Sequence, residues 1–171
     1  DETWQRLLTL YYIRAGARTV IPGAHTGEFA AGDPELLARW MGLVREMIDQ
    51  HGEGRMFLMA AVGGENAMRM AELAAEAEYD VVMLAPTAFA GLDADGVIGL
   101  VEDIASVIPV FAFELQQAIP GAYTYTLDVW RGIFEIALGA KGASFNTYRS
   151  QLMLQAAAES DRREELILAT G

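Results

Sequence analysis

The chain has no cysteine, a single lysine and no apolar run long enough to cross a membrane. Without cysteine, disulfide bonds, thiol catalysis and thiolate zinc sites are all excluded. Apolar runs such as "VVMLAP" and "MFLMAAV" fall far short of the roughly 20 residues that a bilayer helix needs, and the first residues show no basic-then-apolar signal pattern. We therefore expect no membrane association and, by default, a cytoplasmic location.

Positive charge is also scarce. The 171 residues carry 24 acidic and 12 basic side chains, a formal net charge of −12. This charge repels phosphate backbones and anionic membranes, so we expect no nucleic-acid partner. With 53% apolar and 21% charged residues, the composition is that of a globular protein, and the length fits one domain spanning residues 1–171.

Apolar strands alternate with amphipathic helices along the whole chain. The pattern predicts helices over 1–15, 33–51, 65–78, 93–106, 126–137 and 148–160, and strands over 18–23, 55–62, 80–85, 108–113, 139–144 and 165–170. Continuous apolar strands linked by helices indicate a parallel sheet that is buried on both faces. The fold class is therefore α/β.

Two α/β architectures compete. A doubly wound nucleotide-binding sheet would show G-x-G-x-x-G or G-x-x-x-x-G-K-[ST] after its first strand, and "GAHTGEF" is neither. This favours the TIM (β/α)8 barrel, which needs roughly 200 to 250 residues. We therefore expect an incomplete barrel of about six β/α units. Such a sheet exposes two parallel edges, and missing segments or an unusual assembly would have to cover them.

Lys141 is the only lysine and lies in the apolar strand "GAKGAS". Small neighbours (Gly139, Ala140, Gly142, Ala143) would leave room beside the amine. Burial favours the neutral amine, which attacks carbonyl carbon to form a Schiff base, whereas a guanidinium cannot. The alternative is an incidental lysine with its head group in solvent.

Two further segments carry candidate residues. In "GAHTGEF", backbone N–H groups of the glycine turn and the Thr26 hydroxyl could hold a carboxylate, while His25 could act as an acid or base or be an ordinary loop histidine. Glu114 follows the strand "IPVFAF" directly, so it either shares proton transfer near Lys141 or is a solvated loop acid.

Three stretches, "AGARTVIPGAHTGEF", "IPVFAFELQ" and "GAKGASFN", resemble the dihydrodipicolinate synthase and N-acetylneuraminate lyase family. The resemblance covers nearly the whole chain, from the helix before the second barrel strand to the seventh strand. It implies a class I aldolase on an eight-stranded barrel, with Lys141 as the Schiff-base lysine of the sixth strand. The family's G-[ST]-T-G-E loop, which binds the carboxylate of a pyruvate-like substrate, falls on Ala24, His25, Thr26, Gly27 and Glu28.

The chain also departs from the family's pattern. Phe113 and Glu114 occupy the places of a Tyr-Asn pair, and His25 that of the first loop hydroxyl with which the tyrosine relays protons. Because a phenyl ring cannot donate a proton, either His25 or Glu114 has taken over, the reaction differs, or activity is lost. Ala118 replaces an arginine that binds the second substrate, which argues against dihydrodipicolinate synthase activity itself.

These observations predict a Schiff-base lyase or aldolase acting on pyruvate or a similar 2-oxo acid. The catalytic candidates are Lys141, His25 and Glu114, and Ala24, Thr26, Gly27 and Phe113 would surround the substrate. We expect no cofactor and no metal, and the resemblance implies a homo-oligomer, a tetramer or dimer. The alternative is a non-catalytic barrel homologue that binds a small ligand.

Overall fold

The computed structural model describes residues 1–24, 33–52 and 56–170. Its six strands form one parallel sheet in the order β1-β2-β3-β4-β5-β6, so each strand pairs with the next one along the chain. The strands are β1 (Thr19–Val20), β2 (Phe57–Val62), β3 (Val81–Leu84), β4 (Val110–Glu114), β5 (Gly139–Gly142) and β6 (Ile167–Thr170). The helices are α1 (Glu2–Arg14), α2 (Pro34–His51), α3 (Ala67–Glu76), α4 (Ala94–Ala105), α5 (Leu127–Ile136) and α6 (Thr147–Glu159).

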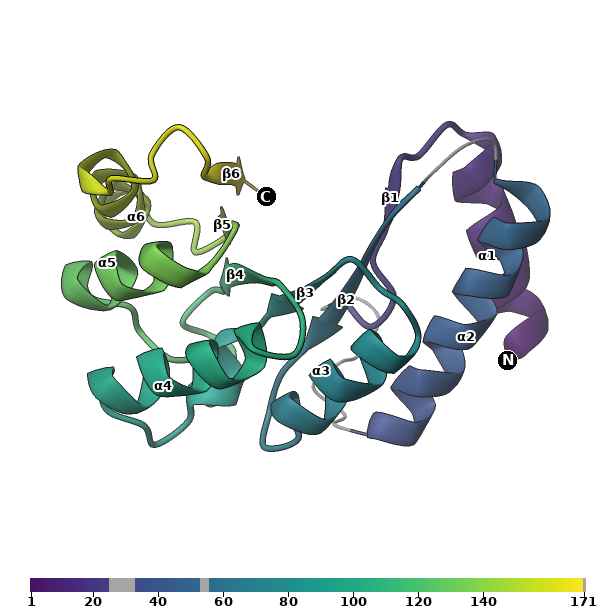
Figure 1. The fold of residues 1–171 in the computed structure, drawn as a ribbon, viewed down its shortest axis with the longest axis horizontal. Coiled ribbons are helices and arrows are strands. Elements are labelled where there is room, and N and C mark those ends of the chain that lie inside the picture. Colours follow the sequence, from purple (N-terminus) through teal and green to yellow (C-terminus); the bar gives the residue numbers. More distant parts are fainter. Residues whose placement is uncertain (25–32, 53–55, 171) are drawn as a thin grey trace.

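The sheet curls, and its helices cover the outer side. Figure 1 shows the helices around the outside of the curved sheet, with β1 and β6 at its two ends. Sequential parallel strands joined by outer helices are the arrangement of a (β/α)8 barrel. The predicted incomplete barrel of six β/α units is confirmed. Within the described ranges, no helix is long and apolar enough to cross a membrane.

The sheet has two apolar faces because successive side chains of a strand point to opposite sides. Toward the helices lies the larger core, which includes Ala60, Val82, Ala112 and the stacked rings of Trp130 and Phe134, whose centroids lie 5.4 Å apart. The inner face carries a smaller cluster of Met59, Ala61, Val81, Met83, Ala85, Phe111, Phe113 and Leu115. A residue's place in β4 or β5 therefore decides which of two environments it meets.

Helix ends follow the capping residues of the sequence. The Asp1 side chain accepts a hydrogen bond from the Thr3 N–H at 2.8 Å, and Asp33 caps α2 with Pro34 in its first turn. Both helix starts were predicted.

Three features differ from the sequence prediction. The strand expected over 18–23 is reduced to Thr19–Val20, because Pro22 has no N–H to extend the ladder. A short 3-10 helix over Pro86–Phe89 follows β3 and was not predicted. At the opposite edge all four residues of β6 are exposed, although a strand buried on both faces was expected.

Candidate active site

Lys141 lies at the carboxyl end of the sheet and on its inner face. In the β4–β5 register it stands directly opposite Phe113, which belongs to the inner cluster. Its Nζ lies 5.1 Å from the centroid of the Phe113 ring. The lysine is partly exposed, whereas Phe113 is buried. The amine therefore has one fixed aromatic neighbour and an open side.

The Phe113 ring favours positive charge on that nitrogen. A cation over an aromatic face gains about 0.5–1 kcal/mol at an exposed site. The gain applies equally to an ammonium ion and to a protonated imine, because both carry the charge on the same nitrogen. Phe113 cannot move a proton, but it can stabilise the cationic forms of Lys141.

The glycines of β5 allow β6 and α6 to approach closely, rather than leaving space beside the Lys141 amine. A Cβ on Gly139 would stand 1.9 Å from the Ile167 carbonyl oxygen of β6, and a Cβ on Gly142 would stand 3.0 Å from the Met153 Cε of α6. Gly139 also has a φ of +155°. Gly139 is therefore required by the close approach of β6, whereas Gly142 leaves room for the end of the Met153 side chain.

Glu114 lies on the other face of β4 from Phe113. It pairs with Gly142 and follows Ala112, which faces the helices, by two residues. The side chain is 1% exposed. The sheet thus separates the Glu114 carboxyl from the Lys141 amine, and the role predicted for Glu114 in proton transfer stays a prediction.

Burial raises the pKa of Glu114, and two neighbours oppose this shift. They are the Ser144 hydroxyl and the positive charge of Arg149, both of which favour the ionised carboxylate. Ser144 approaches closely enough to exert this influence, but within the described residues neither carboxylate oxygen has a well-formed hydrogen bond. Glu114 is therefore an enclosed acid whose charge is only partly compensated.

Arg149 and Tyr125 complete a buried polar group around Glu114. Arg149, in the first turn of α6, is 8% exposed, and its Nη2 has no hydrogen-bond partner in the described part of the chain. The Tyr125 hydroxyl donates to the Phe113 carbonyl oxygen at 3.1 Å. The pKa of Tyr125 is raised well above its ordinary value by burial and then by the Glu114 charge. Sequence reasoning missed Tyr125, because no motif marks it.

The loop candidates are only partly described. Ala24 packs against the inner cluster, on the same face of the sheet as Phe113. Gly23 before it has a φ of +72°, and a Cβ there would stand 2.7 Å from Leu37 Cδ1, so glycine is needed at this turn. His25, Thr26, Gly27 and Glu28 lie outside the described residues, and their distances to Lys141 stay untested.

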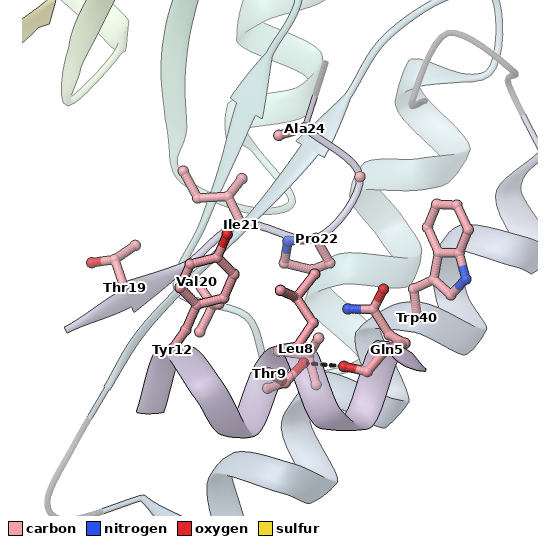
Figure 2. Close-up of a pocket in the computed structure, with 12 residues that line it drawn as sticks. Gln5, Leu8, Thr9, Tyr12, Thr19, Val20, Ile21, Pro22, Ala24 and Trp40 are labelled. Carbon is pink, nitrogen blue, oxygen red and sulfur yellow. Dashed lines mark hydrogen bonds between the residues drawn. The ribbon is translucent and has the colours of Figure 1, made fainter. Parts of the chain in front are cut away.

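The described residues form no cluster of metal ligands. Among 1–24, 33–52 and 56–170, no three histidine, aspartate or glutamate side chains gather as metal ligands would. A cavity of about 310 Å³ lies between α1, β1 and α2 (Figure 2), and neither Lys141 nor Glu114 lines it. We place the candidate site at Lys141 because its chemistry and its position at the carboxyl end of β5 agree.

The chain matches no family model and none of the curated proteins. Solved structures, in contrast, match it over its full length. A prophage protein of the dihydrodipicolinic acid synthase family from Escherichia coli K12, YagE, solved in complex with pyruvate, superposes with a TM-score of 0.80 at 15% identity, covering 100% of this chain and 57% of that one. The chloride-inhibited dihydrodipicolinate synthase from Acinetobacter baumannii, complexed with pyruvate, gives 0.79 at 17% identity with the same coverages.

An N-acetylneuraminate lyase from Mycoplasma synoviae is similar as well, with a TM-score of 0.75, 17% identity and coverage of 99% of this chain and 56% of that one. The chain thus spans a little over half the length of these structures. At such low identity the likeness concerns the fold. Over its six β/α units, this chain has the barrel fold of the dihydrodipicolinate synthase and N-acetylneuraminate lyase structures.

Proposed function

We propose that this chain belongs to a divergent branch of that enzyme family and that Lys141 forms a Schiff base with pyruvate or a similar 2-oxo acid. The observation that carries the proposal is the position of the sole lysine, on the inner face at the carboxyl end of β5 and opposite Phe113. Two structures with the same fold were solved with pyruvate, which supports this substrate class.

In the proposed reaction the neutral Lys141 amine attacks the ketone carbon of the 2-oxo acid. A base takes the proton of the ammonium ion to free the amine for this attack, and the same proton then returns to the carbinolamine hydroxyl, which leaves as water. The protonated imine that remains carries the positive charge on Nζ. The Phe113 ring would stabilise that charge. The electron-poor imine then allows a carbon–carbon bond to the neighbouring carbon to form or break, which is lyase or aldolase chemistry.

The remaining roles follow the sequence prediction. Ala24, Thr26 and Gly27 would hold the substrate carboxylate through the turn that Gly23 begins. His25 is the first candidate for proton transfer, since it follows Ala24, which packs against the inner cluster. Glu114 is the second candidate, and it would have to act from the face of β4 that Lys141 does not share.

Reductive trapping tests this function. Pyruvate and other 2-oxo acids are added with borohydride, and the products are analysed by intact mass and peptide mapping. Besides the N-terminus, Lys141 is the only primary amine, so the assignment is unambiguous. We expect one adduct on Lys141 and none in Lys141→Arg, which keeps the charge but cannot form an imine. No adduct on Lys141 with any 2-oxo acid would refute the proposal.

A second function is supported by Phe113 and Ala118. These residues replace the tyrosine and arginine that the resemblance expects, so the proton relay and the contact to the second substrate are both missing from the pattern. A non-catalytic barrel that binds a small carboxylate would bind pyruvate without being trapped. Calorimetry measures pyruvate binding to the wild type and to Lys141→Arg. Binding through an ion pair alone should persist in Lys141→Arg, whereas binding through an imine should be lost.

A further inference from the structure

Beyond Lys141, the inner face continues toward the carboxyl end of the sheet with apolar residues. Phe113 and Lys141 stand opposite each other in β4 and β5, and the pairing goes on past them, since the Ala143 N–H donates to the Glu114 carbonyl oxygen at 3.0 Å. Two residues further along each strand, Leu115 and Ala143 therefore lie on the same face as Phe113 and Lys141. Leu115 is buried in the inner cluster and Ala143 packs against it. A group attached to the Lys141 Nζ and directed toward the carboxyl end lies beside this apolar wall.

The loop after β4 adds Ile119 to the wall. Ile119 packs against the inner cluster, and its N–H donates to the Gln116 carbonyl oxygen at 3.1 Å, which closes a turn. Further along the loop, the Tyr123 N–H donates to the Pro86 carbonyl oxygen at 3.1 Å, and the Tyr123 ring meets Phe89 edge-on with the centroids 6.1 Å apart. These contacts attach the loop to the 3-10 helix after β3, so the fold itself holds Ile119 in place.

The loops at the carboxyl ends of the four central strands contain no basic residue. The loops that follow β2, β3, β4 and β5 span residues 63–66, 85–93, 115–126 and 143–146. Their only charged residues are two acids, Glu65 and Asp93, and Asp93 caps α4 by accepting a hydrogen bond from the Gly96 N–H at 2.9 Å. The first basic residue after Lys141 is Arg149, which is 8% exposed and lies near Glu114 on the helix side. A second anionic group on a substrate would find no cationic partner in these loops.

This wall discriminates between two kinds of substrate side chain. A carboxylate placed against Leu115 and Ile119 would lose hydration without gaining an ion pair in these loops, which is unfavourable. A hydrocarbon chain in the same place removes apolar surface of both partners from water, which is favourable. The net charge of −12 on the chain further opposes a second anionic group. Both effects favour an uncharged, apolar side chain.

We infer that the 2-oxo acid bound at Lys141 is a monocarboxylate with a hydrocarbon side chain, and that Leu115 and Ile119 select it. The inference rests on the proposed function, because an imine at Nζ is what places the substrate beside this wall. The imine fixes the ketone carbon, and the side chain of the acid extends past Ala143 toward Ile119. Ile119 is then a specificity-determining residue that contacts the substrate side chain and takes no part in proton transfer.

Two 2-oxo acids of matched shape test the selection. In 5-methyl-2-oxohexanoate an isopropyl group takes the place of the distal carboxylate of 2-oxoglutarate. Each acid is titrated against the protein with cyanoborohydride, and peptide mapping gives the concentration that half-saturates the adduct on Lys141. Trapping on free Nα-acetyl-lysine corrects for the intrinsic reactivity of each ketone. We expect the hydrocarbon acid to half-saturate Lys141 at a concentration about tenfold lower than 2-oxoglutarate.

Two variants add a cation to the loop after β4 and should weaken this preference. Ile119→Arg changes the proposed contact itself, and Ala118→Arg adds the same charge at the neighbouring exposed position. Val107→Arg is the control, because Val107 is 38% exposed and precedes β4 at the opposite end of the strand. Each loop variant should shift the ratio of half-saturating concentrations toward 2-oxoglutarate by about fivefold, and the control should keep the wild-type ratio. Circular dichroism checks that all variants are folded.

The outcomes separate this inference from the function on which it rests. Equal half-saturation of the wild type by the two acids, or a preference for 2-oxoglutarate, would overturn the inference and leave Schiff-base formation intact. An unchanged ratio in folded Ala118→Arg would also overturn it, and this variant decides the question if Ile119→Arg does not fold. No adduct on Lys141 with either acid would refute the proposed function and the inference together.

Discussion

The two faces of β4 and β5 place neighbouring residues in opposite surroundings. On the inner face, Phe113 and Lys141 meet across the strands with one side of the amine open. On the helix side, Glu114 is enclosed with Ser144, Arg149 and Tyr125 nearby. The Phe113–Lys141 pair and the next pair in the β4–β5 register, Glu114–Gly142, therefore place an accessible cation and a buried acid on opposite faces. The chemistry available to the chain therefore depends on which face of the sheet a substitution changes.

Replacing Gly139 should damage both faces at once, and we expect the largest effect there. In Gly139→Ala the new Cβ would collide with the Ile167 carbonyl, so β6 must move away from β5. We expect a loss of about 3 kcal/mol or more in the free energy of unfolding, measured by urea denaturation. Gly99→Ala, in α4 with nothing within 4 Å of its Cβ, should instead stabilise the protein by about 0.5–1 kcal/mol. Equal stability of both variants would contradict the described β5–β6 contact.

Arg149→Met tests the helix-side face alone. It removes the positive charge near Glu114 and leaves a buried carboxyl without that compensation. We expect a loss of about 1–3 kcal/mol in unfolding free energy. The matched variant Arg131→Met breaks exposed ion pairs with Asp128 and Glu159 and should cost at most about 1 kcal/mol. Equal losses of unfolding free energy in Arg149→Met and Arg131→Met would show that the Arg149 charge does not stabilise the Glu114 carboxylate.

Glu114→Gln should change how stability depends on pH. Because burial raises the pKa of Glu114 above its unfolded value, the folded state holds the proton more tightly. Its contribution to stability is present below the unfolded pKa and is lost as pH rises through the raised pKa. Relative to wild type, Glu114→Gln should therefore gain on the order of 1 kcal/mol between acidic and mildly alkaline pH. If the unfolding free energies of wild type and Glu114→Gln change in parallel with pH, burial does not raise the pKa of Glu114.

Phe113→Leu should produce the smallest effect, confined to the inner face. Without the ring, a cation on Lys141 Nζ loses about 0.5–1 kcal/mol of aromatic stabilisation, so borohydride trapping of the protonated imine with pyruvate should become about two- to fivefold slower. The rate is measured by mass spectrometry on the single lysine. Phe111→Leu changes the same inner cluster without removing the ring beneath Nζ and serves as the control. An unchanged rate in Phe113→Leu would show that the ring does not act on the amine.

Much of the fold could be predicted because helix starts and strand runs carry local signals. Asp33 and Pro34 marked the start of α2, and the alternation of apolar strands with amphipathic helices predicted the parallel sheet. The 3-10 helix after β3 was missed, and β1 is shorter than predicted because the strand was extended through Pro22, which has no N–H. The importance of Gly139 also depends on the neighbouring strand, which no local pattern reveals.

The site was predicted in part for a similar reason. A solitary lysine among small residues is visible in the sequence, and its position opposite Phe113 follows once strands are aligned. The face of Glu114 could not be read, because "VFAF" is apolar at every position and gives no alternation to count from. Tyr125 reaches the site from the segment before α5, and only the fold brings it to Phe113.

The single lysine allows local opening of the sheet to be measured in solution by proteolysis. An endoprotease that cuts only after lysine has one target, the bond between Lys141 and Gly142, and that bond lies inside β5. Cleavage requires the strand to leave its ladder with β4 and β6, so the appearance of two fragments would time the opening of the sheet at this point.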